Sequence, residues 1–324
     1  MSARVSTVGF FFQFMPRQQS EAMLKEKVHD FWNQQSCDTQ AAQSEKFSKT
    51  YYEEIEQFRY YDQPFIHSFA QFTRYSGKKV LEVGFGAGTD FIQWLRAGAR
   101  VSGIDLTEEA LQNTMRRISA YDLPRPERLE LSDAENLPFP DNSFDLGYSF
   151  GVLHHTPDTG KALRELVRVV SPGGELKVML YNRHSVWALQ LWVKHALLRG
   201  RPWRSFRWAL ANYMESAGTK GFTRKDLLDL FSSLPVHELR IRTEVTSADS
   251  LASSGFPPLN WIYRILLYLA GERRRWDPLK YAERFNTPTP RLVKAGRGVE
   301  PTPALFTGNR LGLYHCITAR KDAG

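Results

Sequence analysis

Three glycines and two acidic residues have the types and spacing of a ligand-binding turn. Gly84, Gly86 and Gly88 stand at alternate positions directly after an apolar run that contains Glu82. Glycine lets the backbone turn sharply, and because it has no Cβ a ligand can approach that backbone closely. Asp105 lies 21 residues beyond Gly84, the spacing at which an acidic residue receives the two hydroxyls of a ribose. These residues predict a site for a ribose-containing ligand.

The spacing of the glycines narrows the choice of ligand. A dinucleotide fingerprint reads G-x-G-x-x-G, but counting from Gly84 places Thr89 at the third glycine position. The pattern here is G-x-G-x-G, so we expect no binding of NAD. Apolar residues with helical spacing follow over 91–96, and the amino end of that helix would direct its positive partial charge at the ligand.

Candidates for proton transfer follow two later strands. His154 and His155 come just after the apolar run 144–150, and Tyr181 ends the run 175–181. Ligand crevices in open α/β sheets form at the carboxyl ends of strands. One of these side chains can serve as a general base. The alternative is that the histidines only make polar contacts or pack on the cofactor, and the three residues after Tyr181 are equally well placed. The base therefore stays unassigned.

The elements that must position these residues alternate along the chain. Strands are expected at 80–83, 99–104, 128–131, 144–150 and 175–181, with helices at 91–96, 108–121 and 161–170 between them. Thr107 is a suitable cap for the second of these helices. Such alternation predicts a parallel, doubly wound α/β sheet. Two more strands, at 239–245 and 312–318, bring the expected total to seven.

The motifs, taken in order, resemble those of a known family. VLEVGFGAGTD, GIDLT, DAENLPFPDNSFD, GVLHHTPD and RVVSPGGELKVMLY occur over residues 78–182. Together they are similar to class I S-adenosylmethionine (SAM) methyltransferases of type 11, a family that includes ubiquinone and menaquinone C-methyltransferases. The resemblance implies a Rossmann-like, mostly parallel sheet, SAM as cofactor and S-adenosylhomocysteine as product.

The resemblance also implies which residues contact the cofactor. Asp133 would contact the adenine amino group, with Ala134 and Glu135 flanking the ring. The glycines would line the methionine moiety, Glu82 would support the loop or the ammonium group, and Phe150, Gly151 and His154 would face the methyl group. The residues expected at the cofactor are Glu82, Gly84, Gly86, Gly88, Asp105, Leu106, Asp133, Ala134, Glu135, Phe150 and Gly151. The candidates for catalysis are His154, His155 and Tyr181, and no metal is expected.

Charge and composition suggest how the remaining chain is organised. Residues 181–300 hold 20 Lys and Arg against 10 Asp and Glu, although the whole chain has a net charge of only +8. We expect a helical lid at 1–75, a core at 76–246 plus 311–324, and a basic, aromatic-rich helical cap at 247–310. Apolar helices beside arginine and tryptophan suit an amphiphilic acceptor or an anionic membrane surface, and equally an ordinary cap. No run of 18 apolar residues and no disulfide framework of cysteines is present, which favours a cytoplasmic protein.

Three functions fit this sequence. The first is methyl transfer from SAM to a small-molecule or lipid-like acceptor. The second is methylation of RNA, which basic residues with interleaved aromatics would serve, although no RNA-binding module is recognisable. The third is a SAM-binding partner subunit without catalysis, against which the intact glycine loop, Asp105 and Asp133 argue. The acceptor and the oligomeric state cannot be inferred from the sequence, because this fold serves many acceptors.

Overall fold

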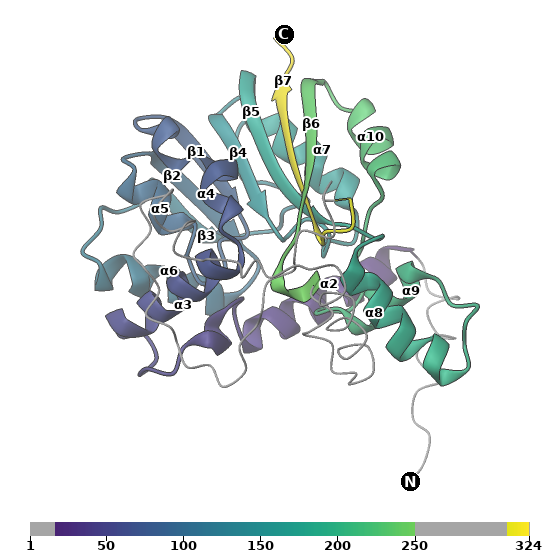
Figure 1. Ribbon diagram of the computed structural model, residues 1–324. Coiled ribbons are helices and arrows are strands. Elements are labelled where there is room, and N and C mark those ends of the chain that lie inside the picture. Colours follow the sequence, from purple (N-terminus) through teal and green to yellow (C-terminus); the bar gives the residue numbers. More distant parts are fainter. Residues whose placement is uncertain (1–16, 250–309, 324) are drawn as a thin grey trace, which may run out of the picture.

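A twisted seven-stranded sheet forms the centre of the molecule (Figure 1). The computed structural model describes residues 17–249 and 310–323, so nearly all of the expected cap at 247–310 and the first 16 residues lie outside the described residues. The strands are β1 (Lys79–Val83), β2 (Arg100–Asp105), β3 (Arg128–Leu131), β4 (Phe144–Phe150), β5 (Val170–Tyr181), β6 (Val236–Glu244) and β7 (Tyr314–Lys321). Their order across the sheet is β3-β2-β1-β4-β5-β7-β6.

The first five strands are parallel, and β7 runs antiparallel between β5 and β6. The strand order reverses between β1 and β4, and ligands of open α/β sheets bind at such a switch point, outside the carboxyl ends of the strands. This arrangement confirms the expected doubly wound, mostly parallel Rossmann-like fold.

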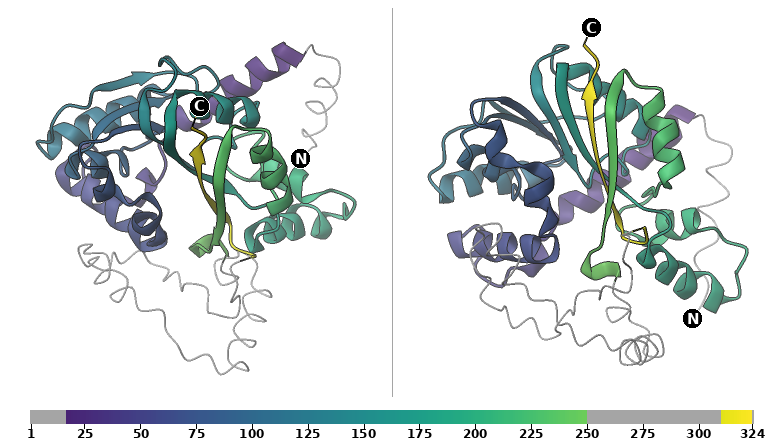
Figure 2. Two further views of the ribbon diagram at one scale, coloured as in Figure 1. Left: turned by 90° about the horizontal axis from the view of Figure 1, so that it is seen from above. Right: turned by 45° about the horizontal axis from the view of Figure 1, so that its top comes forward.

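Helices cover both faces of the sheet, and the described ones are α2 (Arg17–Gln34), α3 (Lys49–Asp62), α4 (Phe65–Ala70), α5 (Phe91–Arg96), α6 (Glu108–Ala120), α7 (Thr159–Val169), α8 (Val186–His195), α9 (Phe206–Tyr213) and α10 (Arg224–Ser232). The Thr107 side chain accepts from the amide of Ala110 and so caps α6, as expected. Thr223 and Asp226 form a capping box at the start of α10. Helix α2 runs across the carboxyl ends of the parallel strands (Figures 1 and 2).

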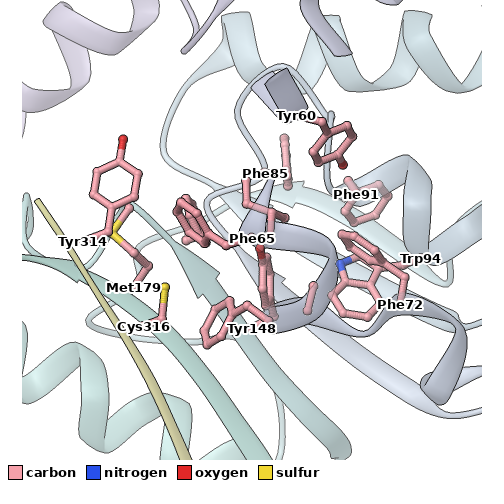
Figure 3. Packing of buried hydrophobic residues seen from close by; sticks show 14 of the residues in the cluster. Tyr60, Phe65, Phe72, Phe85, Phe91, Trp94, Tyr148, Met179, Tyr314 and Cys316 are labelled. Atoms are coloured by element: carbon pink, nitrogen blue, oxygen red, sulfur yellow. The ribbon is translucent and has the colours of Figure 1, made fainter. Parts of the chain in front are cut away.

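The two faces of the sheet bury separate cores because side chains alternate along each strand. On β5, Leu176, Val178 and Leu180 pack with α7 and α10, whereas Met179 and Tyr181 pack on the opposite face. That opposite core is rich in aromatic rings, and Figure 3 shows Phe65 and Tyr148 between Trp94 and Met179. The aromatic residues that the sequence places before the glycine loop are therefore largely part of this core.

Several boundaries differ from the sequence expectation. Strand β5 begins at Val170, five residues before the expected start, because Val170 pairs with Phe144 ahead of a register shift in the ladder. The Pro-Gly-Gly stretch that follows therefore interrupts a strand and does not separate a helix from one. Strand β6 starts three residues earlier than expected, and β7 starts two residues later. Within the described residues, no helix is both long and apolar enough to cross a membrane.

Candidate active site

A cavity of about 790 Å³ lies at the switch point between β1 and β4. Its volume is within the range of roughly 300–1,000 Å³ that is usual for small-molecule sites. The carboxyl ends of the parallel strands form its floor, and side chains of α2 and α3, among them Lys25, Trp32 and Arg59, also line it. Eleven of the residues expected at the site line the cavity: Glu82, Gly84, Gly86, Asp105, Leu106, Asp133, Ala134, Phe150, Gly151, His155 and Tyr181.

The glycine loop turns because each of its three glycines has a positive φ, between +51° and +81°. Gly86 lines the cavity, and no described atom lies within 4 Å of the place where a Cβ would stand. That space is the cradle that a ligand lying on the loop requires. Gly88 does not line the cavity; a Cβ there would lie 2.7 Å from Thr114 Oγ1. This glycine allows the close packing of the loop on α6, and its contact with the cofactor stays a prediction.

Asp105 braces the same loop from the end of β2. Its Oδ2 accepts the amide of Gly86 at 3.0 Å, and its Oδ1 accepts the amide and the hydroxyl of Thr107 at 3.1 and 3.0 Å. Burial raises the pKa of the Asp105 carboxyl, although these hydrogen bonds act in the opposite direction. The carboxylate lies at the cavity wall beside the loop, as a ribose contact requires.

Asp133 lies at the other end of the cavity and touches the helix that covers it. Its Oδ2 accepts from Lys25 Nζ of α2 at 2.5 Å, and its Oδ1 accepts the amide of Glu135 at 2.9 Å. Glu135 does not line the cavity; it is buried and accepts the amide of Asp158 at 2.7 Å. Glu135 therefore holds the loop after β4 in place, and its expected position beside the adenine stays a prediction.

Glu82 and Asp90 form a buried acidic pair under the glycine loop. Burial and the neighbouring Asp90 carboxylate raise the pKa of Glu82 well above its usual value, and its Oε2 accepts the indole N–H of Trp94 at 2.9 Å. Asp90 itself accepts from Arg59 at 3.0 and 2.8 Å. Burial would raise the pKa of Asp90, but the charge and hydrogen bonds of Arg59 outweigh it and lower that pKa. Arg59 thereby ties α3 to the loop.

The three candidates for proton transfer differ in their surroundings. His154 is fully buried, does not line the cavity, and has no hydrogen-bond partner for either ring nitrogen among the described residues. Burial lowers the pKa of His154 well below its usual value, so the ring is neutral. Burial and the charge of Glu215 raise the pKa of Tyr181 well above its usual value. Tyr181 is therefore protonated and donates hydrogen bonds, and of the two histidines only His155 lines the cavity.

Sequence reasoning missed Glu215, an acidic residue that lines the cavity beside His155 and Tyr181. Tyr181 Oη donates to its two carboxylate oxygens at 3.1 and 2.9 Å, and His155 Nε2 lies 3.4 Å from Oε2. The available signal was an acidic residue beside the glycine-rich turn 218–221, after a long run without any acid. Asn182 and Arg183 are used elsewhere: Asn182 Nδ2 donates to the carbonyls of Arg310 and Gly312, and Arg183 pairs with Asp226.

Comparison with known proteins agrees with this architecture. Residues 81–178 match the family model described as "Methyltransferase domain". Methyltransferase GfsG of Streptomyces halstedii is 35% identical over 105 residues, which are 32% of this chain and 37% of that protein. The 27-O-demethylrifamycin SV methyltransferase of Amycolatopsis mediterranei is 34% identical over 102 residues, 31% of this chain and 38% of that protein. The alignments thus span less than two-fifths of these relatives.

A solved structure resembles the chain over more of its length. Geranyl diphosphate C-methyltransferase from Streptomyces coelicolor A3(2), in complex with Mg²⁺, geranyl diphosphate and S-adenosylhomocysteine, has a TM-score of 0.52, with 13% identity over 92% of this chain and 98% of that one. At this identity the likeness concerns the fold. The sheet order, the glycine loop and the switch-point cavity define a Rossmann-like fold. Within this fold, residues 81–178 match the type-11 methyltransferase domain.

Proposed function

We propose that the protein transfers a methyl group from SAM to a small-molecule or lipid-like acceptor. The observation that carries this proposal is the switch-point cavity, which is lined by Asp133, by the glycine loop and by His155, Tyr181 and Glu215. Bound SAM would supply a methyl group on a sulfonium, which is an electrophile without further activation. Gly86 would leave room for the methionine moiety, Asp105 would receive the ribose and Asp133 the adenine amino group. The protein's task is then mainly to align the acceptor, which can supply roughly 7–11 kcal/mol.

The segment 17–75 is proposed to act as the lid of this site. Lys25 of α2 contacts Asp133, and Arg59 of α3 contacts Asp90 beside the glycine loop. Both contacts join the N-terminal helices to residues at the cavity. Because an active site must admit its ligands and then exclude water, contacts of this kind suit an element that opens and closes.

Calorimetry tests the proposed cofactor. We expect SAM and S-adenosylhomocysteine to bind at one site per chain, and NAD not to bind, since Thr89 stands where a dinucleotide loop requires glycine. A titration in which NAD binds tightly and SAM does not would contradict the proposed function. Transfer of a radiolabelled methyl group to RNA, with none to small molecules, would favour the second function considered from the sequence.

One specific observation favours an acceptor drawn from an anionic membrane surface. Between Val186 and Met214 the chain has five cationic side chains and no acidic one. All five (Lys194, Arg199, Arg201, Arg204 and Arg207) are exposed. Large apolar side chains are exposed in the same segment: Leu189, Leu197, Leu198 and, at 74%, Trp203. The segment forms α8, α9 and their connection, which stand out from the body of the domain (Figure 1). Cations beside exposed Trp and Leu suit the interface of an anionic bilayer.

Vesicle binding tests this membrane contact. Changing Arg201 and Arg204 together to Gln should weaken binding to phosphatidylglycerol vesicles by about 2 kcal/mol, since each arginine near such a surface contributes about 1 kcal/mol. This corresponds to roughly a 30-fold loss. The matched control changes Arg125 and Arg164, two exposed arginines elsewhere, and should bind as the wild type does. Equal binding of the two double variants to phosphatidylglycerol vesicles would contradict the membrane proposal. Wild-type protein that binds neutral vesicles as strongly as phosphatidylglycerol vesicles would contradict it as well.

A further inference from the structure

Glu215 is held at the cavity by a backbone conformation that an ordinary residue avoids. Its φ is +50°, in the left-handed region, and its side chain is one-third exposed at the cavity wall. Strained non-glycine residues persist only where the surrounding structure enforces them, and they gather at functional sites. Here the strain places a carboxylate at the end of the cavity where β5 finishes, away from Asp133.

His155 lies beside the same carboxylate. Thr219 Oγ1 and Ser216 Oγ lie 3.1 and 2.8 Å from His155 Nδ1, and Thr219 Oγ1 also donates to the carbonyl of Ser216 at 2.7 Å. These contacts orient the ring. Its Nε2 lies 3.4 Å from Glu215 Oε2, within ion-pair distance, and has no hydrogen-bond partner among the described residues.

Tyr181 orients the same carboxylate. Its hydroxyl lies 2.9 Å from Oε2 and 3.1 Å from Oε1, and its burial keeps it protonated. A carboxylate that accepts from a buried hydroxyl through both of its oxygens has a restricted orientation, so its remaining lone pairs are directed consistently. Other titratable groups close to this cluster are Cys37, Tyr314, His154 and Lys220.

We propose that Glu215 is the general base of methyl transfer, with His155 and Tyr181 as positioning residues, and that the acceptor therefore bears a hydroxyl or another group that must lose a proton. The inference rests on the proposed function. The acceptor's X–H bond breaks and its proton passes to the Glu215 carboxylate. The electron pair left on X forms the bond to the methyl carbon, and the sulfonium sulfur takes the pair of the C–S bond. The products are the methylated acceptor, S-adenosylhomocysteine and a protonated Glu215.

The transfer experiment uses radiolabelled SAM and a solvent extract of the native host as the probe. Glu215→Gln should lower the rate of label transfer by about 10²–10⁴-fold, the usual contribution of a general base, with SAM affinity within threefold of wild type. Tyr181→Phe should lower the rate less and also spare SAM affinity. Label transfer at the wild-type rate by Glu215→Gln would overturn the inference alone. A wild-type protein that binds no SAM, or labels nothing in the extract, would overturn the proposed function and the inference with it.

Glycine variants separate catalysis from folding. Glu215→Gly relieves the left-handed backbone, so the melting temperature should stay equal or rise by about 1–4 °C, while label transfer falls as in Glu215→Gln. Glu238 is the matched control, because it also has a positive φ, +51°, but lies on β6 away from the cavity. Glu238→Gly should shift the melting temperature similarly and leave label transfer unchanged. A parallel loss of folding and transfer in Glu215→Gly would mean that Glu215 is structural.

Nuclear magnetic resonance of the protein without cofactor tests the His155–Glu215 pair directly. With ¹⁵N-labelled histidine, the His155 Nε2 signal, assigned by its loss in His155→Gln, should depend on the carboxylate 3.4 Å away. Glu215→Gln should move this signal upfield, whereas Glu238→Gln should not. A signal that is unchanged in Glu215→Gln would overturn the inference. A divalent cation bound to His154, His155 and Glu215 would also overturn it, since their ligand atoms lie within 4.8 Å of one another.

Discussion

Asp90→Ala is expected to lower the free energy of unfolding by about 3–5 kcal/mol at pH 7. Asp90 is 2% exposed and accepts from Arg59, Tyr60 and Tyr148. Removing the carboxylate leaves the Arg59 guanidinium with Asp38 as its remaining acidic partner at 3.0 Å. Breaking a buried ion pair by removing one partner costs about this amount, because the other charge stays buried. Urea denaturation at pH 7 measures the effect.

The pH dependence of this contribution has a definite sign. The folded-state pKa of Asp90 is lowered because Arg59 and its hydrogen bonds outweigh burial. A group with a depressed pKa adds stability above its unfolded-state pKa, about 3.9 for Asp, and loses it as the pH falls through the folded-state value. The difference between wild type and Asp90→Ala should therefore shrink in acid. A difference that grows in acid would contradict this account.

Asp141 provides the control for Asp90. It pairs with Arg168 at 2.7 Å, as short a contact as that between Asp90 and Arg59, but its side chain is 67% exposed. Exposed ion pairs contribute about 0–1 kcal/mol, so Asp141→Ala should change stability little. An equal loss of unfolding free energy in Asp90→Ala and Asp141→Ala would mean that burial does not determine how much these ion pairs stabilise the fold.

Local sequence patterns predicted most of the sheet and eleven of the residues that line the cavity. Strands β3 and β4 have the expected bounds, because an apolar run between turn residues indicates where a strand begins and ends. The predicted start of β5 was wrong. Pro-Gly-Gly usually ends an element, but here the pairing of Val170 with Phe144 extends the strand past it. Periodicity contains no information about such a pairing, since it depends on a partner strand.

The missed residues of the cavity share one property: their role depends on contacts across the fold. Arg59 lies 31 residues from Asp90, Lys25 lies 108 residues from Asp133, and Glu215 lies 34 residues from Tyr181. The sequence shows each of them as a charged residue on a helix or in a turn, which is usually a solvated surface position. Conversely, Gly88 and Glu135 stand within motifs that resemble a cofactor site, but neither residue lines the cavity.

Alanine variants of Gly84 and Gly86, with Gly173 as a control outside the loop, should separate the effects of backbone strain, side-chain packing and ligand contact. Alanine at Gly84 would place a Cβ 2.2 Å from Val152 Cγ2 at a φ of +81°. The left-handed strain costs about 1–2 kcal/mol, and overpacking costs about 1–3 kcal/mol more. Gly84→Ala should therefore lower the free energy of unfolding by about 2–5 kcal/mol, measured by urea denaturation.

Gly86→Ala should instead cost only the strain, about 1–2 kcal/mol, because no described atom lies within 4 Å of the new Cβ. That space belongs to the cavity, so SAM affinity should fall at least about tenfold, or about 1.4 kcal/mol. Gly173 is the matched control: its φ is +74°, it is equally open, and it lies outside the cavity. Gly173→Ala should cost the same strain and bind SAM as the wild type does. If Gly86→Ala also binds SAM with wild-type affinity in calorimetry, the cofactor does not lie on this loop. In that case the open space at Gly86 is not a ligand cradle, and the placement of SAM at the switch point has to be abandoned.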